Sequence, residues 1–244
     1  MIKLHNIHKN FGDTEVLKGI DIEINQGEIV VIIGSSGTGK STLLRTVNFL
    51  EQANKGTISI DDVSVDTEKH TKAEVLALRR KTGFVFQNYA LFAHLTAKQN
   101  IAEGLITVRG WKKEQAYEKA QQILNEIGLG DKSESYPAAL SGGQQQRVGI
   151  GRAMALEPEL LLFDEPTSAL DPEWVGEVLQ LMKDLAKKHQ TMLVVTHEMQ
   201  FAKEVADKVI FMADGHIVEQ GSPQDIFNNP QDPKLQRFLN QVGV

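Results

Sequence analysis

The nine residues from Gly34 to Thr42, GSSGTGKST, restrict the fold of this chain more than any other feature of its sequence. They match the pattern G-x-x-x-x-G-K-[ST], in which a glycine-rich loop follows a buried strand and opens a helix. Both neighbours are present, because the apolar run IVVII precedes the loop and helical spacing follows it over roughly Lys40–Glu51. The sequence therefore predicts the strand–loop–helix unit of a phosphate-binding α/β fold.

The remaining strand patterns are of two kinds. IKLHNIHKNF, VLKGIDIEIN and GTISIDDVSV alternate apolar and polar residues, which is typical of half-buried antiparallel strands. EIVVIIG, ELLLFDE, TMLVVTH and KVIFMAD are continuously apolar, which indicates strands buried on both faces of a parallel sheet. Helical spacing at about 143–157, 172–189 and 198–207 separates these runs. We therefore expect an α/β core with a mainly parallel sheet and an N-terminal antiparallel β-subdomain.

No buried strand is evident between Gln87 and Leu140. NIAEGLITV and KKEQAYEKAQQILNEIG have helical spacing, and the second stretch stops at Gly128 as it would at a helix C-cap. The tail, from DGHIVEQGSPQDIF onward, predicts a turn, a strand and short helices. The expected organisation is one domain over residues 1–244, with its core in 1–87 and 139–244 and an inserted helical subdomain in 88–138.

Composition excludes several classes of protein. A net charge of −6 and a pI of about 5.7 argue against a nucleic-acid partner. The absence of cysteine excludes disulfides and thiol-based metal or redox sites, and it fits a cytoplasmic protein. The apolar runs are far below the roughly 18 residues that a membrane helix needs, and no signal-peptide pattern opens the chain. We therefore expect that any membrane part of its function belongs to another polypeptide.

The glycine loop and the next strand ends carry the groups that nucleotide hydrolysis requires. Lys40 would reach the β- and γ-phosphates, and the Ser41 hydroxyl would ligate Mg²⁺. Asp164 ends the buried run LLLFD, where doubly wound sheets place their ligands, and would hold Mg²⁺ through water. The adjacent Glu165 could accept a proton from an attacking water, an effect typically of about 10²–10⁴-fold.

Two further polar residues end predicted strands. His197 closes TMLVVTH at the same sheet edge, where a neutral imidazole could hydrogen-bond the γ-phosphate. A lone histidine is more often a surface or core residue, so only its place beside the other strand ends favours this role. Gln87 ends GFVFQ and could contact both Mg²⁺ and the attacking water. The residue taken alone favours neither this site role nor its absence.

A second glycine loop, in LSGGQQQRVGIGRA (140–153), presents a different problem. Ser141, Gly142 and Gly143 open a predicted helix, an arrangement that binds anions through free N–H groups and the helix dipole. A chain with one nucleotide site does not need two such loops.

The motifs together resemble the nucleotide-binding subunits of ATP-binding-cassette (ABC) transporters. The resemblance covers essentially the whole chain, in the order GSSGTGKST, Gln87, LSGGQ, LLLFDE, SALD and His197, and LSGGQ is its most specific element. It implies that two subunits meet head to tail around two ATP molecules. Ser141 and its two glycines would then bind the γ-phosphate of the ATP on the partner's loop, and Asp171, in SALD, would bridge the two sites.

The resemblance also implies a full set of site residues. Phe11, in KNFGD, matches the aromatic residue that stacks on adenine, with a place in the core as the alternative. The ATP-binding set is Phe11, Val16, Gly34, Ser35, Ser36, Gly37, Thr38, Gly39, Lys40, Ser41, Thr42, Gln87, Ser141, Gly142, Gly143, Gln144, Asp164, Asp171 and His197. The expected catalytic residues are Glu165, His197, Gln87 and Lys40, and the expected Mg²⁺ ligands are Ser41, Gln87 and Asp164.

Within this family, RTVNFLEQANKGTISID, FQNYALFAHLTAKQNI and THEMQFAKEVADKVIFMADGHIVEQGSP look most like the ATPases of polar amino-acid uptake systems. This resemblance implies ATP-driven import through integral-membrane permease subunits, an external amino-acid-binding protein as an indirect partner, and a location at the cytoplasmic face of the membrane. Tyr89, Leu91 and Phe92 would line a groove for a short cytoplasmic helix of the permease, unless they belong to the core.

Three rivals are disfavoured to different degrees. A DNA-maintenance ATPase with the same signature would carry long coiled coils or basic faces, and a GTPase or kinase would lack LSGGQ. An exporter or lipoprotein-release ATPase is disfavoured only by the finer resemblance.

The sequence departs from the family pattern at two places, the helix after the signature and the first glycine loop. Gly149 and Gly151 stand where alanines are usual, at about 1 kcal/mol each in helix propensity, so their helix either packs closely on a neighbour or is softer than in relatives. Ser35 replaces a frequent proline, which should matter little because the loop backbone does the binding.

Overall fold

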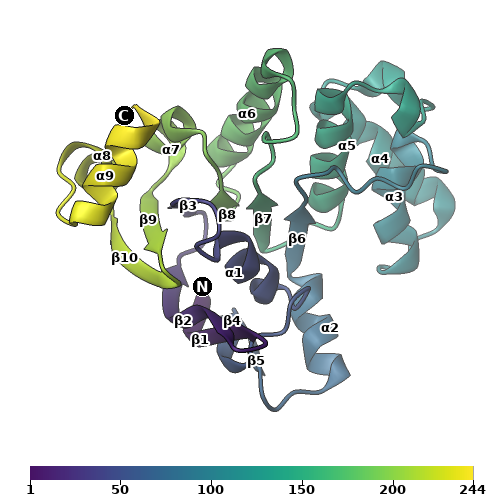
Figure 1. Cartoon of the computed structure of the whole chain (residues 1–244). Helices are drawn as coiled ribbons and strands as arrows, with labels where there is room; N and C mark the ends of the chain where they lie inside the picture. Colours follow the sequence, from purple (N-terminus) through teal and green to yellow (C-terminus); the bar gives the residue numbers. More distant parts are fainter. Residues whose placement is uncertain (244) are drawn as a thin grey trace.

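Six strands form the central sheet in the computed structural model, which describes residues 1–243. Their order is β10-β9-β3-β8-β7-β6; β10 pairs antiparallel with β9, and the other neighbours pair in parallel (Figure 1). The bounds are β3 Ile29–Ile33, β6 Thr82–Val85, β7 Leu160–Asp164, β8 Met192–Val195, β9 Lys208–Ala213 and β10 His216–Gly221. The four continuous apolar runs are β3, β7, β8 and β9, and helices or a second sheet bury both of their faces, as predicted.

A second, antiparallel sheet has the order β2-β1-β4-β5. Its strands are β1 Ile2–Phe11, β2 Thr14–Ile24, β4 Lys55–Ile60 and β5 Val63–Asp66. GTISIDDVSV is therefore a hairpin, β4-β5, that turns at Asp61 with a left-handed φ of +50°. The alternation in β1 and β2 places one face of each strand in the core, which confirms the half-buried pattern.

Helix α1 (Lys40–Val47) packs between the two sheets, and its Leu43 and Leu44 are fully buried in the shared core. The opposite face of the central sheet is covered by five helices (Figure 1). They are α5 Gly142–Ala155, α6 Pro172–Lys187, α7 Met199–Val205, α8 Pro223–Asn228 and α9 Pro233–Val242. These layers confirm the predicted α/β class with an antiparallel β-subdomain.

Helices α3 (Ala97–Thr107) and α4 (Lys113–Glu126) pack with α5 around a separate apolar cluster beyond β6 (Figure 1). Gly128 follows α4 with a φ of +71°, as its predicted C-cap role requires. The remaining helical elements are α2 Lys72–Arg80 and the short 3₁₀ turns Gly130–Lys132 and Pro137–Ala139. The division of the chain at residues 88 and 138 stays a prediction, and its last residue, 244, lies outside the described residues.

One helix boundary was predicted wrongly. The helix expected over Lys40–Glu51 ends at Val47, because the chain leaves the helical conformation at Asn48 and Phe49 adopts a φ of +56°. That turn buries the Phe49 side chain, which is only 7% exposed, so tertiary packing overrides local helical spacing. Within residues 1–243, no helix is both long enough and apolar enough to cross a lipid bilayer.

Candidate nucleotide site

The loop from Gly34 to Gly39 links β3 to α1 and requires glycine at both ends. Gly34 has a φ of +148°, and a Cβ atom there would lie 2.3 Å from the carbonyl oxygen of Met212. Gly39 has a φ of +96°, and its Cβ atom would lie 2.9 Å from Leu17 Cδ2. The backbone is therefore held tightly against β9 and β2, in the strand–loop–helix context that the motif requires.

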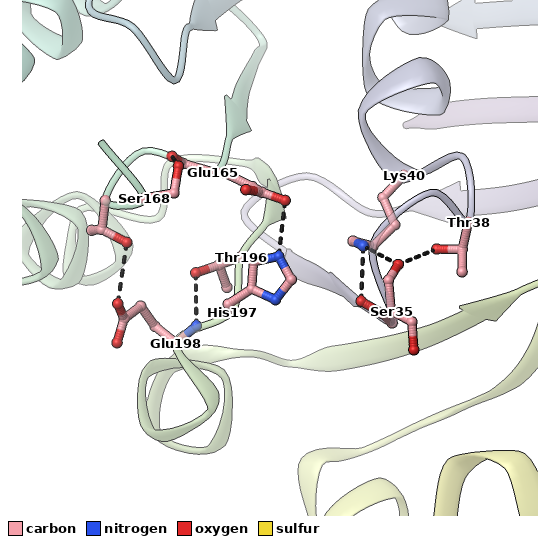
Figure 2. A network of polar contacts seen from close by, with 10 residues as sticks. Ser35, Thr38, Lys40, Glu165, Ser168, Thr196, His197 and Glu198 are labelled. Carbon is pink, nitrogen blue, oxygen red and sulfur yellow. Dashed lines mark hydrogen bonds and ion pairs between the residues drawn. The ribbon is translucent and has the colours of Figure 1, made fainter. Parts of the chain in front are cut away.

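Lys40 is only 4% exposed, and its ammonium group lies inside this loop (Figure 2). Nζ donates hydrogen bonds to the carbonyl oxygens of Gly34 and Ser35, both at 2.8 Å. Burial lowers the pKa of Lys40, whereas the charges of Glu165 and Asp164 raise it. A bound triphosphate could replace the two carbonyl acceptors with anionic oxygens, which suits a cation that burial has partly desolvated.

Asp164 ends β7 with its carboxylate buried at 1% exposure. Arg45 donates to Oδ2 from Nε at 3.2 Å and from Nη2 at 3.0 Å. Oδ1 is buried and has no hydrogen-bond partner among the described residues. A buried carboxylate oxygen without a donor is what a Mg²⁺-bound water would satisfy, so the residue fits its predicted role.

Arg45 was not predicted as a site residue. It lies on α1 one helical turn after Ser41, so the two residues share a helix face, and α1 packs against β7. The four-residue spacing between Ser41 and Arg45 was the only sequence signal for Arg45. Its contact with Asp164 joins residues 119 positions apart in the chain, so no local pattern reveals it.

The side chains of Glu165, which directly follows Asp164, and His197 contact each other (Figure 2). Glu165 Oε1 lies 3.0 Å from His197 Nε2. Glu165 adopts a left-handed φ of +46°, and its backbone N–H donates to Val195 O at 2.9 Å, which ties it to the end of β8. The His197 side chain is 44% exposed, so it is not a core residue. The structure thus joins two strand-end residues that the sequence placed at one sheet edge.

Gln87 lies two residues beyond the end of β6 and is half-buried. The backbone just before it is held in place, because the buried Gln146 donates from Nε2 to Phe86 O at 3.1 Å. Gln87 therefore stands at the same carboxyl-end edge of the parallel sheet as Asp164 and His197.

Phe11, at the end of β1, is 47% exposed, which rules out the core alternative. Lys9 Nζ lies over its ring, 4.6 Å from the centroid. Val16 lies on β2 and lines a cavity of about 550 Å³ together with Ser35, Ser36, Gly37 and Thr38. The cavity leaves room for a base and a ribose beside the glycine loop, although Phe11 is not one of its lining residues.

The second glycine loop lies elsewhere in the chain. Ser141 is the N-cap of α5, and a capping box joins it to Gln144: Gln144 N donates to Ser141 Oγ at 3.3 Å, and Ser141 N donates to Gln144 Oε1 at 3.0 Å. A Cβ atom at Gly143 would lie 2.8 Å from Trp174 Cβ on α6. Across the described chain, no hydrogen bond or ion pair joins Ser141–Gly143 to the loop after β3.

Asp171 is the N-cap of α6 and is exposed, and its side chain makes no capping hydrogen bond in the described structure. The predicted residues thus form two separate groups within one chain. The first combines the glycine loop with the ends of β6, β7 and β8, and the second combines the starts of α5 and α6.

Gly149 and Gly151 lie on the face of α5 that packs against neighbouring segments. A Cβ atom at Gly151 would lie 3.0–3.1 Å from side-chain atoms of Ile123, Ile101 and Ile127, and one at Gly149 would lie 3.3 Å from Tyr89 O. The glycines therefore allow α5 to pack closely on α3, α4 and the segment after β6.

Residues 17–168 match the family described as ABC transporter, and a family described as "AAA domain, putative AbiEii toxin, Type IV TA system" matches residues 136–202. The chain is 54% identical over 243 residues to the L-cystine import ATP-binding protein TcyC of Bacillus subtilis (99% of this chain, 98% of that one). It is 49% identical over 243 residues to the glutamine transport ATP-binding protein GlnQ of Escherichia coli, with 100% of both chains covered.

Among solved structures, the dimeric post-hydrolysis state of the ATP-binding cassette MJ0796, bound to ADP and Pi, has a TM-score of 0.80 and 36% sequence identity. The match covers 91% of this chain and 99% of that one. The family match spans more than half of the chain, and the relatives align over nearly all of it. The chain belongs to the ABC transporter family.

Proposed function

We propose that this protein hydrolyses ATP at two sites shared between the subunits of a head-to-tail dimer, and that it thereby powers import of a polar amino acid. The observation that carries the proposal is the separation of the two glycine loops. Lys40, Asp164 and the Glu165–His197 pair stand at one sheet edge, whereas Ser141 caps a helix whose neighbours are Tyr89, Leu170 and Trp174. In a head-to-tail dimer, the Ser141 loop of a second chain completes the site at the sheet edge of the first chain, and the first chain does the same for the second.

Hydrolysis follows from the groups at the sheet edge. Glu165 accepts the proton of the attacking water, and His197 fixes the carboxylate through its 3.0 Å contact and can reach the γ-phosphate. Lys40 and the loop N–H groups neutralise the phosphate oxygens. Bound Mg²⁺ would neutralise further phosphate charge, and Ser41, Gln87 and Asp164 would hold it.

The second loop would complete the site of the partner. Helix α5 begins at Gly142 and has Ser141 as its N-cap, so the backbone N–H groups of Gly142 and Gly143 lack intrahelical acceptors, whereas that of Gln144 donates to Ser141 Oγ. An anion at that end is favoured by these donors and by the helix dipole. The exposed Asp171, at the start of α6, would lie between the two nucleotide sites.

We place the permease contact at a cavity of about 380 Å³ between β6, α3 and α5. Its apolar lining includes Phe84, Phe86 and Phe92, and the Phe92 side chain is 45% exposed. Of the three residues expected there, only Phe92 lines the cavity. Leu91 packs against the helical cluster instead, and Tyr89 is half-buried with its hydroxyl bonded to Ala169 O. The cavity suits a short apolar helix from a membrane subunit, which would hold the protein at the cytoplasmic face of the membrane.

Import is favoured over export by relatives whose names describe cystine and glutamine transport. The test is reconstitution of the protein in vesicles with the permease subunits encoded beside its gene and the cognate binding protein. We expect ATP-dependent uptake of a labelled polar amino acid, and loss of uptake when the protein carries Glu165→Gln. ATP hydrolysis without uptake, or movement in the opposite direction, would contradict the import proposal.

A further inference from the structure

Tyr89 joins two segments that the proposed dimer would present to the partner's ATP. It lies between β6 and α3, and its hydroxyl donates a 3.0 Å hydrogen bond to the carbonyl oxygen of Ala169. Ala169 belongs to the loop from Glu165 to Asp171, which links β7 to α6. Throughout residues 1–243, this is the only hydrogen bond between the 86–92 segment and that loop.

The second glycine loop reaches the same point. A Cβ atom on Gly142 would lie 2.8 Å from Tyr89 Oη and 3.3 Å from Leu170 Cδ2. The phenol, the start of α5 and the loop before α6 therefore meet without room for one methyl group. A displacement of any one of the three would disturb the other two.

The backbone at Tyr89 is itself fastened to α5. Arg152 donates to Ala90 O at 2.7 Å and to Tyr89 O at 3.3 Å. Tyr89 and Ala90 both have left-handed φ values, +55° and +50°, which are uncommon for residues other than glycine and persist where surrounding contacts hold them. The ring is thus carried rigidly by the helix that Ser141 caps.

The hydroxyl is suited to act as a donor. A carbonyl oxygen can only accept, so the phenol O–H supplies the proton of the hydrogen bond to Ala169 O. Removal of this O–H, with the ring retained, would therefore break the link to the loop.

Building on the shared-site proposal above, we propose that Tyr89 is a positioning residue for the partner's ATP. Its hydroxyl holds the Glu165–Asp171 loop against Gly142, so that the loop and the Ser141–Gly143 segment approach the partner as one unit. The permease cavity includes Ala90 and Phe92, on either side of Leu91, so a helix seated there would press on the segment that carries this link. The hydroxyl would then connect membrane-subunit contact to the geometry of the partner's site.

The test is Tyr89→Phe, which keeps the ring and removes only the donor. Tyr117→Phe is the matched control, because Tyr117 lies on α4 and its hydroxyl makes no hydrogen bond among the described residues. The first measurement is amide hydrogen exchange of the monomer without nucleotide. Exchange in peptides covering 165–171 should be faster in Tyr89→Phe than in wild type, and unchanged in Tyr117→Phe. Equal exchange in all three proteins would overturn the link.

The second measurement is ATP-driven dimerisation, with Glu165→Gln in every protein to suppress turnover. Loss of one hydrogen bond should raise the ATP concentration for half-maximal dimerisation by about 2- to 10-fold in Tyr89→Phe. Binding of a fluorescent ATP analogue to the monomer should not change, since the glycine loop is intact.

The outcomes separate this inference from the proposal on which it rests. Faster loop exchange with unchanged dimerisation would remove the positioning role while leaving the shared site standing. Absence of ATP-driven dimers in the Tyr117→Phe and reference proteins as well would overturn the shared site, and the role of Tyr89 with it.

Discussion

Glu165 Oε1 lies 3.0 Å from His197 Nε2, although the two residues are 32 positions apart in the chain. The contact exists because β7 and β8 are neighbouring parallel strands whose carboxyl ends meet at one edge of the sheet. It places a partly buried carboxylate, 19% exposed, beside the loop that holds Lys40. This is the arrangement that a general base for water needs.

Replacing Glu165 by Gln should lower ATP turnover by at least about 10²-fold and leave ATP binding intact, because the amide keeps the shape of the side chain but cannot accept the proton. Steady-state phosphate release and nucleotide binding measure the two effects. Glu118→Gln, on the exposed face of α4, is the control and should turn over normally. Turnover of Glu165→Gln within a few-fold of wild type would remove this residue from the base role.

Phe11→Ala should raise the KM for ATP by about tenfold and change kcat little, because base–aromatic stacking is worth roughly 1–3 kcal/mol and acts equally in ground and transition states. Phe11→Tyr keeps the ring and should restore the KM. An unchanged KM in the folded alanine variant would mean that the exposed ring serves another purpose.

Arg45→Gln should raise the Mg²⁺ concentration needed for half-maximal nucleotide binding by several-fold, because the guanidinium fixes Oδ2 of Asp164 and leaves Oδ1 free. Mg²⁺ titrations of nucleotide affinity provide the readout. Arg45→Lys keeps the charge but loses the planar guanidinium, so its half-maximal Mg²⁺ concentration should lie between those of wild type and Arg45→Gln. A lower half-maximal Mg²⁺ concentration in Arg45→Gln than in wild type would instead show that Arg45 competes with the metal for Asp164.

Gly151→Ala and Gly176→Ala place the same methyl group on two helices with different surroundings. A Cβ atom at Gly151 meets three isoleucines at 3.0–3.1 Å, whereas one at Gly176 on α6 has no described atom within 4 Å apart from its chain neighbours and the backbone of its own helix. Gly176→Ala should raise the free energy of unfolding by up to about 1 kcal/mol, and Gly151→Ala should lower it by about 1 kcal/mol. Urea unfolding measures both. An equal increase in the free energy of unfolding in both variants would mean that the glycines of α5 lower its helix propensity without being needed for close packing.

The elements that could be predicted are those set by a local sequence pattern, such as an apolar run or a glycine at a helix end. Continuous apolar runs become central strands because both faces of the sheet are covered, and Gly128 ends α4 because a left-handed residue is needed there. The end of α1 was missed because burial of Phe49, a tertiary effect, decides it.

The placement of candidate site residues at one sheet edge was predictable where motif and strand end coincide, as at Asp164, Glu165 and His197, and their chemical roles stay predictions. Arg45 and the Tyr89 hydroxyl could not be found in this way. Their partners are 119 and 80 residues away, and no local pattern encodes a contact of that separation.

The shared nucleotide site requires that Ser141 contacts the ATP bound to the partner subunit. Two substitutions test this: Lys40→Ala damages the first glycine loop, and Ser141→Arg places bulk in the second. In one heterodimer each subunit carries one substitution, so a shared arrangement leaves one site whole and puts both lesions in the other. In the second heterodimer both substitutions are on one subunit, so each shared site carries one lesion.

The decisive measurement is ATP trapped per purified, differently tagged heterodimer, with Glu165→Gln in every subunit to prevent hydrolysis. A shared site predicts that ATP is trapped when the lesions are on opposite subunits and that little ATP is trapped when they are on the same subunit. The reverse order, with more ATP trapped when one subunit is free of both lesions, would show that each site is built within one chain and would contradict the head-to-tail dimer.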